Sequence, residues 1–207
     1  MVHHAALPFN EMPAFLHALR GRKGIAARAL EFAALTAART GEVLGACWRE
    51  VDLTAKVWTI PADRMKAGRE HRVPLSDASL DLLGKVRPLA LMVDGAPDPA
   101  APLFPGPRRA LPMSNMTMLM LLRRMSRDDL TAHGFRSTFS DWAAERTAYP
   151  REVVEMALAH TIGNKVEAAY RRGDLFEKRQ RLMQAWARWC SSPPPAGEVV
   201  ALANRSA

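Results

Sequence analysis

The chain has 207 residues, of which 48% are hydrophobic, enough to bury the core of one sizeable domain. Its formal charge is +8, and 23 Arg against 6 Lys carry the positive charge. Guanidinium groups bind phosphate oxygens bidentately, so a polyanion is the expected partner, although a solvated basic face would give the same composition. No apolar run is long enough for a membrane span or a secretory signal, and the spacing of Cys47 and Cys190 fits no metal site. We therefore expect a cytoplasmic protein.

The beginning of the chain predicts consecutive helices. One helix is predicted over Asn10–Leu19 with Asn10 as its cap, and a second helical pattern covers Gly24–Ala38. The segment Arg39–Glu42 interrupts this pattern, and Thr40 is predicted to cap a further short helix. Arg39 is therefore expected at a junction between two helices.

A period of two then replaces the helical spacing. The segments Val57–Pro61 and His71–Leu75 predict two antiparallel strands, with Lys66 in the turn between them. A helix over Ser76–Val86 follows, with Ser76 as its cap, and the proline-rich stretch Pro88–Pro107 predicts a long loop. These patterns predict an α+β fold with a small antiparallel sheet in the N-terminal third.

Helical patterns fill most of the remaining chain. They cover Asn115–Met125, Ala132–Arg146, Arg151–Ala159, Lys165–Arg172 and Leu175–Cys190. The final segment, Ser191–Ala207, contains three consecutive prolines and little apolar periodicity, so we expect a flexible tail there. The fold is therefore expected to be mostly helical.

Tyr170 is one of only two tyrosines in the chain, and two arginines follow it directly. A phenol near the end of a helix usually packs as an amphipathic residue. Where positive charge converges on it, the same phenol can attack a phosphate. The role of Tyr170 therefore depends on what the rest of the chain brings to it.

Two arginines and a histidine are the first candidates to surround that phenol, and each also has a structural interpretation. His133 and Arg136 have the i, i+3 spacing that places both on nearly one face of a helix, a weak signal that taken alone favours a structural role. Arg39 lies among small apolar residues, so its desolvation must be compensated by a carboxylate such as Glu42 or by a ligand anion.

Lys66 taken alone is typical of a solvated turn, and His160, which closes an apolar run, is typical of a buried core. The order of the candidates changes this interpretation. An arginine, a hairpin lysine, H-x-x-R, a second histidine and a tyrosine ten residues later resemble the catalytic domain of the tyrosine recombinases, the phage integrase family. The similar motifs are Ala38–Val43, Trp58–Pro61, Arg64–Lys66, Val73–Ser76, His133–Arg136 and Leu158–Tyr170.

The resemblance covers about residues 5–190 and is to integrases of prophages and bacterial genomic islands. It implies the tyrosine recombinase catalytic-domain fold and an enzyme that breaks and rejoins DNA strands. Arg39 and Arg136 would hold the non-bridging oxygens of the scissile phosphate, and Tyr170 would be the nucleophile. A free phenol has a pKa of about 10, so attack near neutral pH needs proton removal and strong stabilisation of charge. Two fixed guanidinium groups supply that stabilisation.

The resemblance also assigns the remaining site residues. Lys66 would be the general acid toward the leaving 5′ oxygen, His133 would assist proton transfer, and His160 would donate a hydrogen bond to the phosphoryl group. The product would be a 3′-phosphotyrosyl link that conserves the phosphodiester energy. Neither ATP nor a divalent ion is then required, and no cofactor is expected.

The implied partners are double-stranded DNA carrying attachment sites, further copies of the chain in a tetramer on DNA, and accessory DNA-bending or excision proteins. The implied location is the bacterial nucleoid. Residues 1–190 are assigned to the catalytic domain and residues 191–207 to the tail. Family members carry core-binding and arm-binding domains before this region, which this chain is expected to lack. We therefore expect weak, salt-dependent binding through phosphates.

Two other functions share part of these expectations. A type IB topoisomerase uses the same chemistry but relaxes DNA without sequence preference. A shortened, non-catalytic DNA-binding or interaction module would compete with a complete recombinase for its sites. The presence of all six expected active-site residue types favours the recombinase.

Overall fold

The fold is α+β and mostly helical. The computed structural model describes residues 6–108, 110–160 and 173–193. Its α-helices are α1 (Met12–Arg20), α2 (Ile25–Thr36), α3 (Thr40–Leu44), α4 (Asp77–Val86), α5 (Thr117–Arg124), α6 (Gly134–Arg146), α7 (Arg151–Ala157) and α9 (Phe176–Cys190). Short 3-10 turns lie at Phe9–Glu11, Trp48–Glu50, Ala62–Arg64 and Arg87–Leu89. Within the described residues, no helix combines the length and the apolar character needed to cross a membrane.

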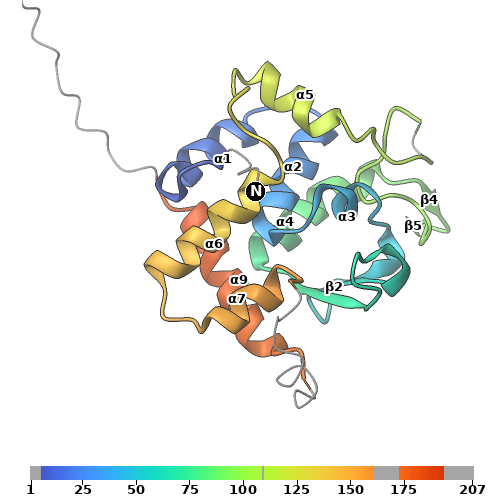
Figure 1. Ribbon diagram of the computed structural model, residues 1–207. Coiled ribbons are helices and arrows are strands. Elements are labelled where there is room, and N and C mark those ends of the chain that lie inside the picture. Colours follow the sequence, from blue (N-terminus) through green and yellow to red (C-terminus); the bar gives the residue numbers. More distant parts are fainter. Residues whose placement is uncertain (1–5, 109, 161–172, 194–207) are drawn as a thin grey trace, which may run out of the picture.

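Helix α2 lies at the centre of the molecule, where it packs against α1, α4, α5, α6 and α9 (Figure 1). Its sequence is apolar on nearly all sides, as expected for a helix that is covered all round. The helix ends at Ala37, which adopts a left-handed conformation with φ of 51° and turns the chain toward α3. Trp186 of α9 donates a hydrogen bond from Nε1 to the carbonyl of Ala34, at 2.8 Å. The C-terminal helix is thereby fixed to the core.

Three antiparallel strands form the main sheet, in the order β1 (Val51–Asp52), β2 (Val57–Ile60), β3 (His71–Pro74). Residues Ile60 and His71 form the last pair of the β2–β3 ladder, so the hairpin turn begins directly beyond them. The predicted hairpin is therefore confirmed. The predicted loop over Pro88–Pro107 contains the short strands β4 (Met92–Val93) and β5 (Ala96–Pro97), which pair with each other.

The two predicted caps at α1 and α4 had different outcomes. The hydroxyl of Ser76 accepts a hydrogen bond from the backbone of Ser79 at the start of α4, which confirms the cap. The predicted cap at Asn10 is wrong. Asn10 lies inside a 3-10 turn, and α1 begins after Glu11 without a side-chain cap. Proline in the first turn of α1 leaves one fewer backbone N–H to be satisfied there.

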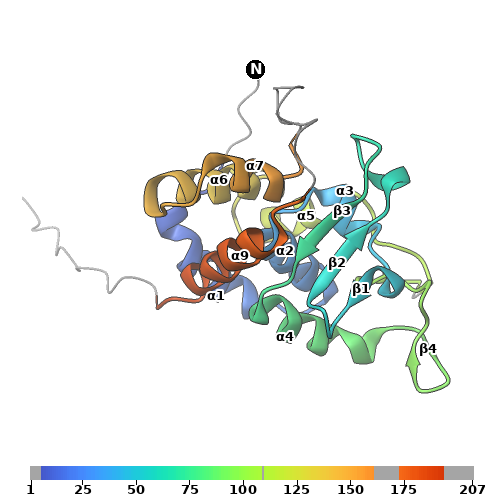
Figure 2. The same cartoon turned by 90° about the horizontal axis from the view of Figure 1, so that it is seen from below.

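Helices α6, α7 and α9 form the C-terminal part of the fold (Figure 2). Phe139 and Trp142 of α6 pack against Trp186 of α9, with ring centroids 5.6 and 5.0 Å from that indole. This aromatic contact places α6 over the same core as α2. The helix predicted over Lys165–Arg172 and the tail from residue 194 lie outside the described residues.

Candidate active site

The C-terminal end of α7 is the place where three of the candidate residues meet. The last carbonyl groups of a helix have no partner within the helix and carry partial negative charge. Here Arg136 donates from Nη2 to the carbonyl of Leu158 at 2.6 Å, and Arg39 donates from Nη2 to the carbonyl of Ala159 at 3.2 Å. Two arginines from different elements are therefore fixed against adjacent peptide groups.

Arg39 lies at the junction between α2 and α3, as the sequence predicts. It precedes the first residue of α3, so Arg39 and not Thr40 occupies the cap position. Glu42 replaces the predicted threonine hydroxyl, because its carboxylate accepts from the Arg39 backbone N–H at 2.8 Å and from Nη1 at 2.6 Å. The predicted ion pair with Glu42 is therefore present. It orients the Arg39 guanidinium, which keeps 26% of its side-chain surface exposed.

Arg136 lies on α6 and is 5% exposed, so its charge is almost fully desolvated. Its Nη1 donates to the carbonyl of Ala37, the left-handed residue that ends α2. Burial and, to a lesser degree, the charge of Arg39 lower the pKa of Arg136 to about 10, and Glu42 acts in the opposite direction. This pKa lies well above neutral pH, so Arg136 remains a cation.

His160 follows the end of α7 and bonds to the same arginine. Its Nε2 lies 3.2 Å from Nη2 of Arg136, and its Nδ1 lies 2.7 Å from the carboxylate of Glu155. A guanidinium only donates, so Nε2 accepts and the proton is on Nδ1, which donates to Glu155. The side chain is 45% exposed, so the interpretation of His160 as a buried core histidine is wrong.

His133 and Lys66 are placed differently from the arginines. His133 precedes the first residue of α6 and is exposed, whereas Arg136 one turn later is buried, so the two do not share one environment. Lys66 is exposed in the turn between β2 and β3. Among the described residues, none forms a hydrogen bond or ion pair with Lys66. The structure thus brings together Arg39, Arg136 and His160, and Tyr170 lies outside the described residues.

A sequence profile gives the family. The profile of the phage integrase family matches residues 6–175. This range includes Tyr170 and the five candidate residues whose positions the structure describes. The chain belongs to the phage integrase family. The resemblance predicted from the motifs is therefore confirmed.

Curated relatives agree with this membership. Prophage integrase IntA of Escherichia coli strain K12 is 36% identical over 181 residues, which are 86% of this chain and 42% of that protein. The integrase of Shigella phage Sf6 is 31% identical over 190 residues, which are 88% of this chain and 47% of that protein. The chain thus spans less than half the length of these relatives.

Solved structures confirm the predicted fold class. The integrase from mycobacterium phage Brujita has a TM-score of 0.60 at 16% identity, over 89% of this chain and 57% of that chain. A lambda integrase tetramer bound to a Holliday junction has a TM-score of 0.57 at 18% identity, over 80% of this chain and 49% of that chain. At these identities the likeness concerns the fold, which is that of the tyrosine recombinase catalytic domains.

Arg64 lies between β2 and β3 and is a further neighbour of the site. It points inward, where it pairs with Glu50 and donates from Nη2 to the carbonyl of Glu42 at 2.5 Å. A Cβ atom at Gly45 would lie 2.9 Å from this nitrogen, so a larger residue there would displace the Arg64 guanidinium. Arg64 therefore ties the hairpin to the residue that orients Arg39.

His71 and Arg179 are two further neighbours of the site that the patterns did not single out. His71 begins β3, and the charges of Arg39 and Glu42 act on its ring. Burial, followed by the charge of Arg179, lowers the pKa of His71 to about 4. Their only sequence signals were a histidine at a half-buried strand position and an arginine within the apolar face of a helix.

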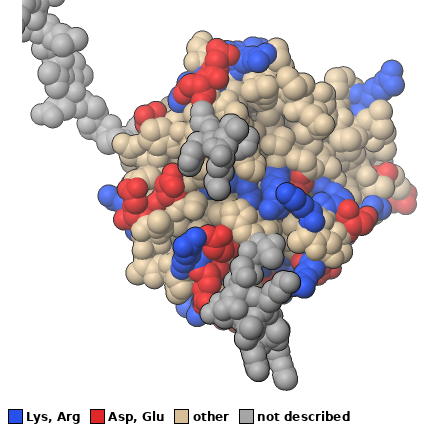
Figure 3. Space-filling view, viewed as in Figure 1, with Lys and Arg blue, Asp and Glu red and all other residues tan. Residues whose placement is uncertain are grey.

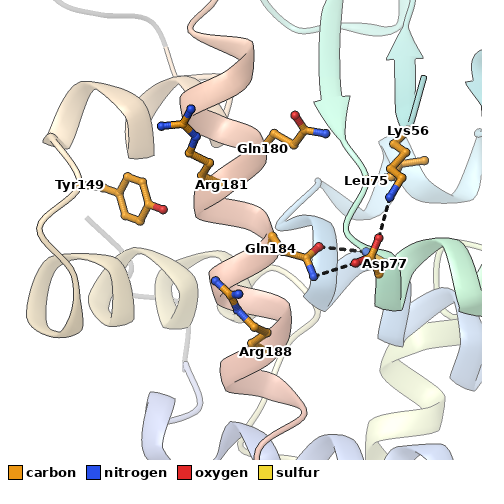
Figure 4. Close-up of a pocket in the computed structure, with 8 residues that line it drawn as sticks. All are labelled: Lys56, Leu75, Asp77, Tyr149, Gln180, Arg181, Gln184 and Arg188. Atoms are coloured by element: carbon orange, nitrogen blue, oxygen red, sulfur yellow. Dashed lines mark hydrogen bonds and ion pairs between the residues drawn. The ribbon is translucent and has the colours of Figure 1, made fainter. Parts of the chain in front are cut away.

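The second tyrosine, Tyr149, lies elsewhere. It lines a surface cavity of ≈ 470 Å³ beside α9, between the side chains of Arg181 and Arg188 (Figure 4). In the same cavity Lys56 and Gln184 both bond to the Asp77 carboxylate. None of the described catalytic candidates lines this cavity.

Basic side chains mark the face that carries the site. Figure 3 shows Lys and Arg atoms gathered near the middle of this face, over α3. Within the part of the chain that the structure describes, no group of three or more His, Cys, Asp or Glu side chains is arranged to hold a metal ion. The arrangement therefore offers fixed cations to an anion such as a phosphate.

Proposed function

We propose that this chain is the catalytic part of a site-specific DNA recombinase that cleaves and rejoins strands through a 3′-phosphotyrosyl intermediate. The observation that carries the proposal is the fixing of Arg39 and Arg136 on adjacent carbonyls at the end of α7, with His160 bonded to the second arginine. Two preorganised cations at one point suit a phosphodiester that gains negative charge during attack.

The arginines act as a clamp on one phosphate. Each guanidinium carries five N–H donors in a fixed fork, more than the described contacts of Arg39 and Arg136 use. The remaining donors can bind the two non-bridging oxygens. Because Glu42 and the α7 carbonyls fix both forks before DNA arrives, little reorganisation is needed in the transition state.

Tyr170 is the proposed nucleophile. Its phenolic oxygen attacks the phosphorus and forms a new O–P bond, the bond to the 5′ oxygen breaks, and the phosphate keeps its bond to the 3′ oxygen of the DNA. Attack by a 5′ hydroxyl reverses these steps and reseals the strand. Tyr149 lies in the cavity beside α9, whose lining includes none of the described catalytic candidates, which supports Tyr170.

Proton transfers are assigned to three other side chains. Lys66 protonates the departing 5′ oxygen, and His133 assists removal of the phenolic proton. His160 hydrogen-bonds the phosphoryl group. Glu155 orients the ring for this role, since its carboxylate lies 2.7 Å from Nδ1.

DNA and further copies of the chain are the proposed partners. A related integrase of lambda forms a tetramer on a Holliday junction, and exchange of strands between two duplexes needs more than one nucleophile. We extend this self-association and the double-stranded DNA substrate to this protein. The cations over α3 provide the electrostatic attraction.

The test is covalent capture on DNA. The substrate is a pool of nicked duplexes with a randomised core. After cleavage, the short fragment that carries the 5′ hydroxyl diffuses away and cannot reseal the strand. The phosphotyrosyl adduct therefore accumulates, and its DNA can be sequenced. We expect an adduct whose modified residue is Tyr170, absent in Tyr170→Phe and retained in Tyr149→Phe. Adducts of equal yield on every sequence would indicate a topoisomerase. Binding without any adduct would indicate a non-catalytic DNA-binding module and would overturn the proposal.

A further inference from the structure

Glu42 on α3 is bonded by its side chain to Arg39 and by its backbone to Arg64. Its carboxylate accepts from the backbone N–H of Arg39 at 2.8 Å and from Nη1 at 2.6 Å. Its carbonyl accepts from Nη2 of Arg64 at 2.5 Å. One residue of α3 therefore connects a phosphate-binding arginine to the turn between β2 and β3, and Figure 2 shows α3 beside this hairpin.

The carbonyl of Glu42 lies in the last turn of α3, where carbonyls take partners from outside the helix. The neighbouring carbonyls of Gly41 and Val43 accept from backbone N–H groups that follow the helix. The one of Glu42 accepts from the side chain of Arg64 instead. This guanidinium lies so close to the chain that a Cβ atom at Gly45 would be 2.9 Å from Nη2. The hairpin is thus attached directly to the end of α3.

A buried carboxylate fixes Arg64 from its other side. Glu50, in the 3-10 turn before β1, has a side chain that is 5% exposed and pairs with Nη1 of Arg64. The second oxygen of Glu50 accepts from Nε1 of Trp58 at 2.9 Å, and Trp58 is fully buried in β2. A charge-assisted bond to a fixed partner is among the stronger bonds of a folded chain. The Arg64 guanidinium is therefore held in place between this 3-10 turn and α3.

Lys66 follows Arg64 by two residues. Met65, which lies between them, is 7% exposed and packs in the core, whereas residues 66–70 are all exposed. Two residues of chain span at most about 7 Å, so the attachment of Arg64 confines the backbone of Lys66 to that distance. The connection from Lys66 to His71, where β3 begins, is five residues long and spans about 17 Å when extended. Arg64 therefore restricts Lys66 more closely than the strand that follows.

We propose that Arg64 is a positioning residue, which sets Lys66 relative to Arg39 so that the lysine meets the leaving 5′ oxygen of the phosphate that the arginines hold. This inference rests on the proposed recombinase function. Both terminal nitrogens of Arg64 are directed at acceptors of the protein, so the guanidinium has no assigned contact with the reacting atoms. It acts by joining the hairpin to α3, which keeps a general acid and a phosphate-binding group from different elements in one geometry.

The experiment separates proton donation from phosphate binding. The core-site duplex captured with the unchanged chain is made in two forms, one with the normal bridging 5′ oxygen and one with sulfur in its place. In both, the phenolic oxygen forms a bond to phosphorus. The 5′ oxygen takes a proton as its bond to phosphorus breaks, whereas sulfur leaves with the electron pair as a thiolate, because a thiol has a pKa of only about 8.5. Single-turnover rates of adduct formation are measured on both forms at saturating protein.

Arg64→Lys keeps a charge opposite Glu50 but lacks the fork that binds the Glu42 carbonyl at the same time. We expect it to cleave the oxygen form about 10- to 100-fold more slowly, the range for a small displacement of a catalytic group. The sulfur form should restore most of that rate. Arg69→Lys makes the same change at an exposed arginine of the same turn and is the matched control.

A second variant displaces the guanidinium without removing it. The Cβ atom of Gly45→Ala would push Nη2 of Arg64 away from α3, so the same preference for the sulfur form should appear. Gly84→Ala is the control, because a Cβ atom there meets no described atom within 4 Å. Urea unfolding shows that each variant is folded under the conditions of the assay.

Combination with Lys66→Ala tests whether Arg64 acts through the lysine. Once Lys66 is absent, Arg64→Lys should cause no further loss on the oxygen form, because the group that it positions is gone. A further loss of about 10-fold in that background would overturn the inference. So would equal defects of Arg64→Lys and Gly45→Ala on both forms, or unchanged rates on the oxygen form. No adduct of the unchanged chain with either form would instead contradict the recombinase function itself.

Discussion

Nη2 of Arg136 lies 3.2 Å from Nε2 of His160 and 2.6 Å from the carbonyl oxygen of Leu158. One guanidinium nitrogen therefore fixes both the end of α7 and the histidine two residues later. Glu155 holds the opposite nitrogen of the same ring, so the ring cannot turn without breaking one of these bonds. A change at Arg136 is thus expected to disturb His160 as well, and the two substitutions should not be additive.

Arg136→Lys keeps a positive charge but removes the planar fork that reaches two carbonyls and a histidine. We expect the rate of covalent adduct formation to fall by about 10²- to 10³-fold, as for loss of a donor to a developing oxyanion. The measurement is the initial rate on the captured core-site duplex. Arg181→Lys changes an exposed arginine of α9 and should keep the original rate. An unaltered rate in Arg136→Lys would remove this residue from the site.

Glu42→Gln should loosen Arg39. The carboxylate accepts from both the backbone and the side chain of Arg39, and an amide can replace only one of these acceptors. We expect the free energy of unfolding to fall by about 1–3 kcal/mol, with slower adduct formation. Urea unfolding gives the first value, and Glu145→Gln, on the exposed face of α6, is the control. Equal stability of the two variants would contradict a structural role of the pair.

Glu50→Ala should destabilise the base of the hairpin. The buried Glu50 carboxylate pairs with Arg64 and accepts from Nε1 of Trp58 at 2.9 Å. Its removal leaves a buried indole N–H without a partner and a partly buried guanidinium without its counter-charge. We expect a loss of about 2–4 kcal/mol, below the range for a fully buried pair because Arg64 keeps 22% of its side-chain surface exposed. Urea unfolding followed by tryptophan fluorescence measures it, and a loss below about 1 kcal/mol would contradict the argument.

Stability should depend on pH through His71. Its pKa is about 4 in the folded chain and about 6.5 when unfolded, so between these values the unfolded state binds more protons. Stability is therefore complete above the unfolded pKa and falls as the pH drops toward 4. This group contributes at most about 2 kcal/mol to the loss between pH 7 and pH 5. Urea unfolding at both values should show a smaller pH dependence in His71→Gln than in the unchanged chain, and identical dependence would contradict the assignment.

The two thiols should react slowly. Burial raises the pKa of Cys47 and raises that of Cys190 well above its usual value, so little thiolate forms near neutral pH. We expect modification by a disulfide reagent at pH 8 to be at least about 10²-fold slower in the folded chain than in urea, with Cys190 the slower of the two. Mass spectrometry of peptides assigns each site. Rapid labelling of Cys190 under native conditions would contradict its placement, in which 1% of its surface is exposed.

Helix positions followed well from the sequence, whereas local details at their ends did not. The apolar pattern before Arg39 predicted α2 within about two residues, because the helix buries nearly all its sides in one core. The caps predicted at Asn10 and Thr40 were wrong. At α3 a carboxylate three residues later replaces the expected hydroxyl, since Glu42 must also pair with the guanidinium of Arg39. The pairing of Glu42 with Arg39 at the site therefore replaces the threonine cap that the local sequence favours.

Environment was the other property that the patterns misjudged. Taken alone, the apolar run before His160 is typical of a core histidine, but the residue leaves the end of α7 and bonds to Glu155 and Arg136. Arg64 lies between the two predicted strands, and its side chain points inward to Glu50. Both positions depend on partners in other elements. The hydrophobic periodicity of one segment does not show such partners.

The sequence by itself determined the family, the helical order and the residue types of the site, because these depend on local spacing and on motifs. Only the tertiary structure decided where the site is assembled. The carbonyls at the end of α7 need donors from outside the helix, and the one of Ala159 is bound by Arg39, 120 positions earlier in the chain. Leu158 is bound by Arg136 of α6 in the same way. No local pattern contains these pairings, since folding alone brings the donors to one helix end.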